Sequence, residues 1–163
     1  MIFSSLALWL AWPASGSAGQ VFELTQDPEV VLEHQRLPGN ARAQARTRGA
    51  IRSVPHLFIY HPDDSPAFHM QGVRRNFERE LSLMISDFRV QRSMAPLELL
   101  LEHAIDAEGR ILTPADLPER RITMVLYRRP DCPACDQVEA ALDDWIDDHP
   151  DYDPTVIRVA LPE

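Results

Sequence analysis

Lysine is absent from this sequence, and all 16 of its basic residues are arginines. These arginines stand against 25 acidic residues, which leaves a formal net charge of −9 at pH 7. No block of basic residues offsets this charge locally. Because an acidic chain repels the phosphates of DNA and RNA, nucleic acid is excluded as an expected partner.

Cysteine occurs only twice, at Cys132 and Cys135, inside one CxxC motif. Two cysteines rule out a disulfide framework, so the pair is either a small structural staple or a redox site. A disulfide that closes so short a loop removes little entropy from the unfolded chain and stabilises weakly. The sequence therefore favours thiol–disulfide chemistry, with an idle structural disulfide as the alternative.

The apolar run near the N-terminus is short. IFSSLALWLAW, at residues 2–12, has 11 residues, whereas a membrane-spanning helix needs about 20. Small residues at Gly16 and Ala18 follow it, which predicts a signal peptide at residues 1–18 with cleavage after Ala18. No Lys or Arg precedes the run, so an uncleaved anchor and a buried N-terminal helix stay open as alternatives. We expect an exported protein, periplasmic or secreted, with no stable membrane span after cleavage, in a compartment where disulfides persist.

A length of 163 residues and a hydrophobic fraction of 45% suit one folded domain. We expect an N-terminal arm at residues 19–48, with a short strand in QVFELT and a short helix in PEVVLEHQRL, and a single domain at residues 49–163. Within this domain, β-rich runs predict strands in SVPHLFIY, AFHMQG, ITMVLY and TVIRVAL. Helical spacing of apolar residues predicts helices over residues 73–85, in PLELLLEHAI and in DQVEAALDDWIDD. The pattern indicates an α/β fold.

The CxxC motif follows a buried-strand pattern and opens a helix, and this placement suits thiol–disulfide exchange. Exchange needs a thiolate that attacks and a second thiol that resolves the mixed disulfide. Cys132 would lie at the helix N-terminus, where the positive end of the helix dipole lowers a thiol pKa. Arg128 and Arg129 are expected to tune this pKa downward, while Asp131 opposes them. Cys135, one turn further, would be the shielded resolving thiol.

Other uses of a CxxC motif fit the sequence less well. A c-type haem site needs a histidine directly after the second cysteine, but Asp136 stands there. A structural zinc site needs four ligands, and one CxxC supplies two. His103 and His149 would complete such a site only if the fold brought them to the cysteines. We therefore expect no metal site and no bound cofactor, because the disulfide is itself the redox group.

The stretch MVLYRRPDCPACDQVEAAL resembles the active-site strand, motif and helix of the thioredoxin-like superfamily. Its aromatic–basic–Pro–x–Cys-Pro-x-Cys pattern is closest to the glutaredoxins. The sequence departs from thioredoxins at Asp131, where they carry an aromatic residue, and at Leu126, where they carry a buried acid. Proton transfer to or from Cys135 would therefore require water or another residue.

The second half of the family's domain has a counterpart upstream of the cysteines instead of downstream. RGAIRSVPHLFIYHPDDSPAFHMQGVRRNFERELSLMI is similar to that half, which consists of a cis-proline strand, a hairpin partner, a glycine and a closing helix. The resemblance implies a thioredoxin-like fold, a central mixed sheet flanked by helices, in circularly permuted order. Residues 49–85 would hold the cis-proline half, residues 86–121 the connector and residues 122–163 the βαβ half with the CxxC. A truncated unit completed by a partner is the alternative.

The resemblance implies an exported thiol–disulfide oxidoreductase. Cys132 and Cys135 would exchange disulfides with cysteine pairs of other exported proteins or with glutathione-like thiols. Val54 and a cis Pro55 would shape the substrate groove, with the Val54 backbone pairing to an extended peptide. His56 would lie next to this groove. A non-catalytic binding or assembly protein of a cell-envelope complex is the alternative function.

Overall fold

The computed structural model describes residues 20–27, 51 and 53–162, and its α/β fold is built on one six-stranded mixed sheet. The strands are β1 (Val21–Gln26), β2 (His56–Tyr60), β3 (Pro66–Gln71), β4 (Ala104–Ile105), β5 (Thr123–Arg128) and β6 (Thr155–Ala160). The α-helices in the described part are α3 (Phe77–Ser86), α4 (Leu97–Leu101) and α5 (Pro133–Asp148). Two short 3₁₀ turns, η1 (Pro114–Asp116) and η2 (Pro150–Tyr152), complete the elements. The predicted α/β class is confirmed.

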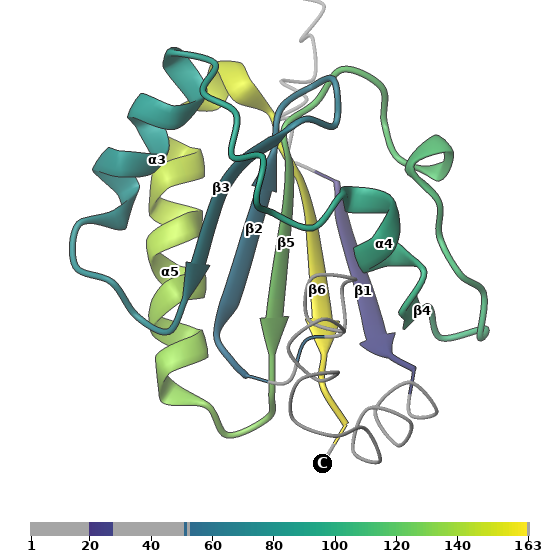
Figure 1. The fold of residues 1–163 in the computed structure, drawn as a ribbon. Helices are drawn as coiled ribbons and strands as arrows, with labels where there is room; N and C mark the ends of the chain where they lie inside the picture. The colour runs from purple at the N-terminus through teal and green to yellow at the C-terminus, as the bar shows by residue number, and fades with distance from the viewer. Residues whose placement is uncertain (1–19, 28–50, 52, 163) are drawn as a thin grey trace, which may run out of the picture.

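The sheet order is β3-β2-β5-β6-β1-β4, and Figure 1 shows the strands side by side in this order. Strand β5 lies parallel to β6, and β6 parallel to β1. The pairs β2–β5, β2–β3 and β1–β4 are antiparallel. The parallel pair β5–β6 is joined by α5, which makes a βαβ unit.

Helices cover both faces of the sheet, so the core has two layers. Successive residues of β2 point to opposite faces because side chains alternate along a strand. Leu57 and Ile59 pack with α3 and α5 in one cluster, whereas Phe58 and Tyr60 pack with α4 in the other. Figure 1 shows α3 and α5 together, with α4 on the other side of the sheet. The α5 side carries the cysteine motif.

The predicted helix at residues 73–85 begins later than its apolar spacing indicates. Asn76 has a φ of 57°, which lies in the left-handed region. A left-handed residue cannot continue a right-handed helix, so α3 starts at Phe77. Its buried side chains are Phe77, Leu81 and Ile85, three of the apolar positions that indicated the helix.

The predicted helix in PLELLLEHAI is also shorter than expected. Its first part forms α4, but the last two residues, Ala104 and Ile105, form β4. This strand pairs with Thr25 and Gln26 of β1. Strand β1 itself lies in the segment predicted to be an N-terminal arm, and it is a full member of the sheet through β6. The predicted signal peptide at residues 1–18 and the helix in PEVVLEHQRL lie outside the described residues.

Within the described ranges, no helix has both the length and the apolar character that crossing a membrane requires.

Candidate functional site

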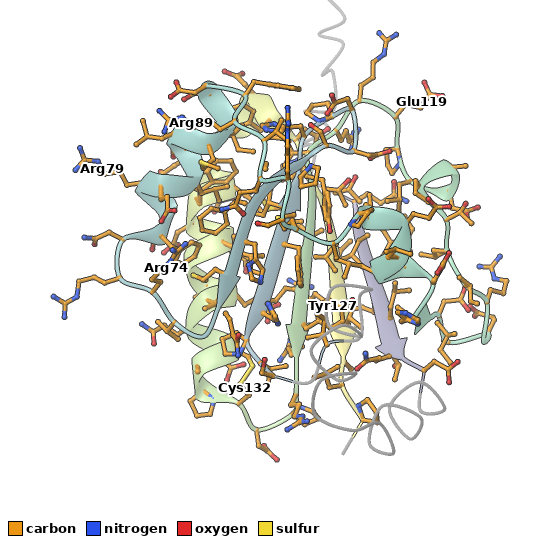
Figure 2. The ribbon with its side chains drawn as sticks, viewed as in Figure 1. Arg74, Arg79, Arg89, Glu119, Tyr127 and Cys132 are labelled. Atoms are coloured by element: carbon orange, nitrogen blue, oxygen red, sulfur yellow. A yellow bond between two sulfur atoms is a disulfide. The ribbon has the colours of Figure 1, made fainter. Side chains whose placement is uncertain are left out.

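The CxxC motif lies where β5 ends and α5 begins. Strand β5 is buried over five of its six residues, and Leu161 N–H donates to the carbonyl of Arg128 at 2.8 Å, which fixes the strand's end. Asp131 then turns the chain with a φ of 54°. Cys132 is the N-cap of α5, and Pro133 occupies the first helical position, where a missing N–H costs nothing. Figure 2 shows Cys132 beside the first turn of α5, at one end of the sheet.

Cys132 and Cys135 form a disulfide, and the two sulfurs differ in exposure. Cys132 is half-buried, while Cys135 is fully buried. The backbone N–H of Cys135 donates to Cys132 Sγ at 3.2 Å. Backbone N–H groups at a helix N-terminus stabilise negative charge. The position of Cys132 therefore suits a thiolate once the disulfide is reduced. An incoming thiol has access to Cys132 and not to Cys135.

Pro55 lies at the same end of the sheet as the cysteines. Strand β2 runs antiparallel to β5, and His56, the first residue of β2, pairs with Tyr127 near the end of β5. The Val54–Pro55 peptide bond is cis, as expected. The carbonyl of Pro55 accepts a hydrogen bond from Gly72 N–H at 2.8 Å, which extends the β2–β3 hairpin to this end. The role of Val54 and Pro55 in holding a substrate stays a prediction.

The two arginines before the motif have different surroundings. Arg128 donates to Glu139 Oε2 at 2.8 Å and lies 3.5 Å from Asp136 Oδ1, both on α5. Its positive charge is therefore shared with two carboxylates. Arg129 is exposed, as is Asp131. The expected effect of Arg128 and Arg129 on the Cys132 pKa stays a prediction.

His149, one of the two histidines that would have to complete a zinc site, lies far from the cysteines. His149 caps the C-terminal end of α5, whereas Cys132 caps its N-terminal end. The 16 residues between them span about 24 Å at 1.5 Å per residue, so His149 cannot share a metal with the cysteines. No group of three or more His, Cys, Asp or Glu side chains suited to a metal gathers among the described residues.

The hairpin brings together two histidines that the sequence spacing did not single out. His56 and His69 lie on neighbouring strands with their Nε2 atoms 2.5 Å apart. Burial lowers the pKa of His69, and the positive charge of Arg74 lowers it further. Only the register of the hairpin could have predicted the contact between His56 and His69, because the two residues are 13 positions apart in the sequence.

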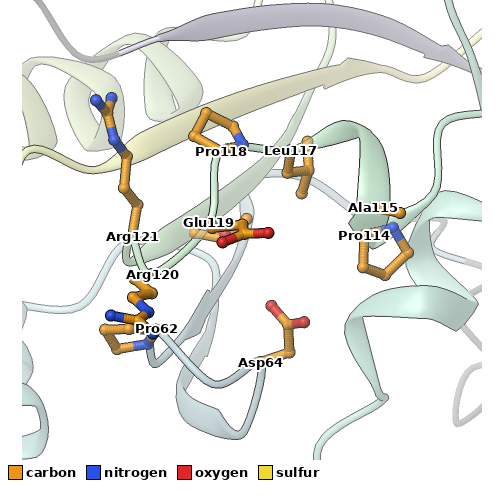
Figure 3. Close-up of a pocket in the computed structure, with 10 residues that line it drawn as sticks. Pro62, Asp64, Pro114, Ala115, Leu117, Pro118, Glu119, Arg120 and Arg121 are labelled. Carbon is orange, nitrogen blue, oxygen red and sulfur yellow. The ribbon is translucent and has the colours of Figure 1, made fainter.

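Two surface hollows are lined by residues other than the two cysteines. One, of about 480 Å³, lies between the start of α3 and α5 and is lined by Arg74, Arg75 and Gln137 among others. The other, of about 320 Å³, lies at the end of the sheet remote from the motif, beside Pro62 and Thr123. Figure 3 shows the carboxylates of Asp64 and Glu119 facing into this second hollow. Neither hollow contains a cysteine.

Comparison with models of protein families, with curated proteins and with solved structures finds no match for this chain.

Proposed function

We propose that this protein is a thiol–disulfide oxidoreductase that exchanges disulfides through Cys132 and Cys135. The observation that carries the proposal is the disulfide between a half-buried Cys132 at the N-cap of α5 and a fully buried Cys135. One accessible sulfur beside a helix N-terminus and one shielded sulfur are what attack and resolution require. A disulfide that served only as a staple needs no such difference in exposure.

We further propose that the fold is thioredoxin-like with its two halves in permuted order. The support is topological. The strand before the cysteines, β5, has a parallel neighbour, β6, on one side and an antiparallel neighbour, β2, on the other. The hairpin β2–β3 is followed by α3, which packs on the same face as α5. The order of elements, with the hairpin and its closing helix before the cysteine half, supports the proposed permutation.

The proposed reaction follows from the two sulfurs. The Cys132 thiolate attacks one sulfur of a substrate disulfide, which forms a mixed disulfide and releases one substrate thiolate. Cys135, after losing its proton, attacks Cys132 Sγ and releases the second substrate thiolate. Two electrons pass from the protein to the substrate, and the released thiolates take up two protons. The same steps in reverse transfer the disulfide of the protein to a substrate dithiol.

We propose exported proteins with cysteine pairs, or small glutathione-like thiols, as substrates. The proposed location, the periplasm or the extracellular space, rests on the predicted signal peptide at residues 1–18. In an oxidising compartment the two cysteines can persist as a disulfide.

The test is a redox titration of the purified protein, read by thiol alkylation and mass spectrometry across glutathione ratios. We expect a reversible transition between about −120 and about −270 mV, the range of working exchange proteins. Cys135→Ser, in which Cys132 is a free thiol, should attack a model substrate disulfide, release one substrate thiol and stay trapped as a mixed disulfide, and Cys132→Ser should not. A pair that stays oxidised below about −300 mV would be a structural disulfide, and the binding or assembly function would then replace the enzyme.

A further inference from the structure

The β2–β3 hairpin places two imidazoles on one face of the sheet. His56 pairs with Gln71 across the hairpin, and Phe58 pairs with His69. Residues two apart on a strand share a face, and directly paired residues of antiparallel strands share a face as well. His56, Phe58 and His69 therefore lie together on the α4 side of the sheet. The disulfide-bearing helix α5 covers the other side.

The two rings direct the same nitrogen at one point. His56 Nε2 and His69 Nε2 are 2.5 Å apart, which is shorter than an ordinary protein hydrogen bond of about 2.7–3.2 Å. Without a metal, one neutral ring donates its Nε2–H to the Nε2 lone pair of the other. A metal cation can replace that proton and accept a lone pair from each nitrogen.

Neighbouring aromatic rings hold this geometry in place. The His56 and His69 ring centroids lie 4.7 and 4.8 Å from that of Phe58, and Tyr127 meets Phe58 edge-on at 5.9 Å. His56 is 7% exposed, while His69 is half-buried and leaves the pair a route to solvent. Both imidazoles are thus oriented before any ligand arrives, which reduces the entropy lost on binding.

We propose that His56 and His69 form a two-imidazole chelate for a divalent cation of tetragonal preference, Cu²⁺ in particular. Metal–nitrogen bonds of about 2.0 Å at a right angle place two nitrogens about 2.8 Å apart. The rings then need to separate by only about 0.3 Å from their present spacing. A tetrahedral ion such as Zn²⁺ needs about 3.3 Å between the nitrogens and a larger movement of the hairpin.

Affinity points to the same ion, because Cu²⁺ binds nitrogen ligands more tightly than the other divalent first-row metals do. The described residues provide no cluster of three or more ligands, so water would complete the coordination. The site is therefore an open one, separate from the cysteine pair, and does not depend on the proposed redox function.

The experiment is a titration of the purified, fully oxidised protein with Cu²⁺, followed by electron paramagnetic resonance. The oxidised form keeps both thiols out of the measurement. We expect one equivalent of Cu²⁺ with nitrogen hyperfine splitting from two imidazoles. His56→Phe and His69→Phe should each weaken binding about tenfold or more and remove the two-nitrogen pattern. The matched control, His103→Phe, should leave both unchanged.

Phenylalanine keeps an aromatic ring in the stack, and far-UV circular dichroism checks that each variant folds. A measurement on the unmodified protein avoids variants altogether, since bound Cu²⁺ should broaden the NMR signals of His56 and His69 before those of the other histidines. Equal copper binding by the unmodified protein and both variants would overturn the proposal. So would a protein that takes up no Cu²⁺, because the two imidazoles would then share a proton only. The double variant Cys132→Ser/Cys135→Ser, which has no thiol, should bind copper normally, so this result stands apart from the redox test.

Discussion

Arg128 Nη1 lies 2.8 Å from Glu139 Oε2, and this ion pair ties the last residue of β5 to α5 one turn beyond Cys135. The second carboxylate oxygen of Glu139 faces Arg158 Nε of β6 at 2.5 Å. Glu139 therefore links both strands of the parallel pair to the helix that carries the cysteines. Its side chain is 17% exposed, so the charges interact in a partly desolvated setting.

We expect Glu139→Gln to lower the free energy of unfolding by about 1–3 kcal/mol, because each of two half-buried guanidinium groups loses one of its two carboxylate partners and keeps only the more exposed one, Asp136 or Glu23. Urea denaturation of the oxidised protein measures the change. The matched control is Glu80→Gln, which removes an exposed partner of Arg74 and should cost at most about 1 kcal/mol. Equal losses in the two variants would contradict the role assigned to Glu139.

Removing the hydroxyl group should change the stability of the protein differently at two buried tyrosines on the α4 side of the sheet. Tyr60 Oη donates to the carbonyl of Ala95 at 2.8 Å, whereas Tyr127 Oη is buried and finds no partner among the described residues. We expect Tyr60→Phe to destabilise by about 1 kcal/mol, and Tyr127→Phe to be neutral or stabilising because it removes an unsatisfied polar group. Thermal unfolding of the two variants side by side provides the measurement. A larger loss in Tyr127→Phe than in Tyr60→Phe would show that the assignment is wrong.

The elements that the sequence predicted well are those whose signals are local. The run ITMVLY, followed by Cys132 and a helical apolar stripe, marked β5 and α5 because strand and helix periods differ. The turn cluster between SVPHLFIY and AFHMQG marked the β2–β3 hairpin for a similar reason. The position of the cysteine site at the end of β5 followed directly from these patterns.

The features that escaped prediction depend on distant parts of the chain. Residues Ala104 and Ile105 continue an apolar helical pattern, yet pairing with β1 makes them a strand. The late start of α3 depends on the left-handed conformation of Asn76. Asparagine tolerates this conformation, but the neighbouring sequence does not predict it. The meeting of His56 with His69 depends on hairpin register, which no single-strand pattern encodes.

The lowered pKa of His69 makes the stability of the protein depend on pH. Burial, and then the charge of Arg74, disfavour the protonated ring in the folded state, while the unfolded chain has the ordinary value of about 6.5. The unfolded state therefore binds more protons just below this pH, and stability falls as the pH drops from about 6.5 toward the folded pKa.

We expect the free energy of unfolding of the unmodified protein, relative to His69→Phe, to decrease as the pH is lowered from about 7.5 to about 5. Urea denaturation at intervals across this range, with a chelator present to exclude metal, measures the difference. The lowered pKa values of Asp63, Asp106 and Asp116 act at more acidic pH and are common to both proteins, so they cancel. A difference that stays constant, or that grows as the pH falls, would mean that the folded protein protonates His69 as readily as the unfolded chain does.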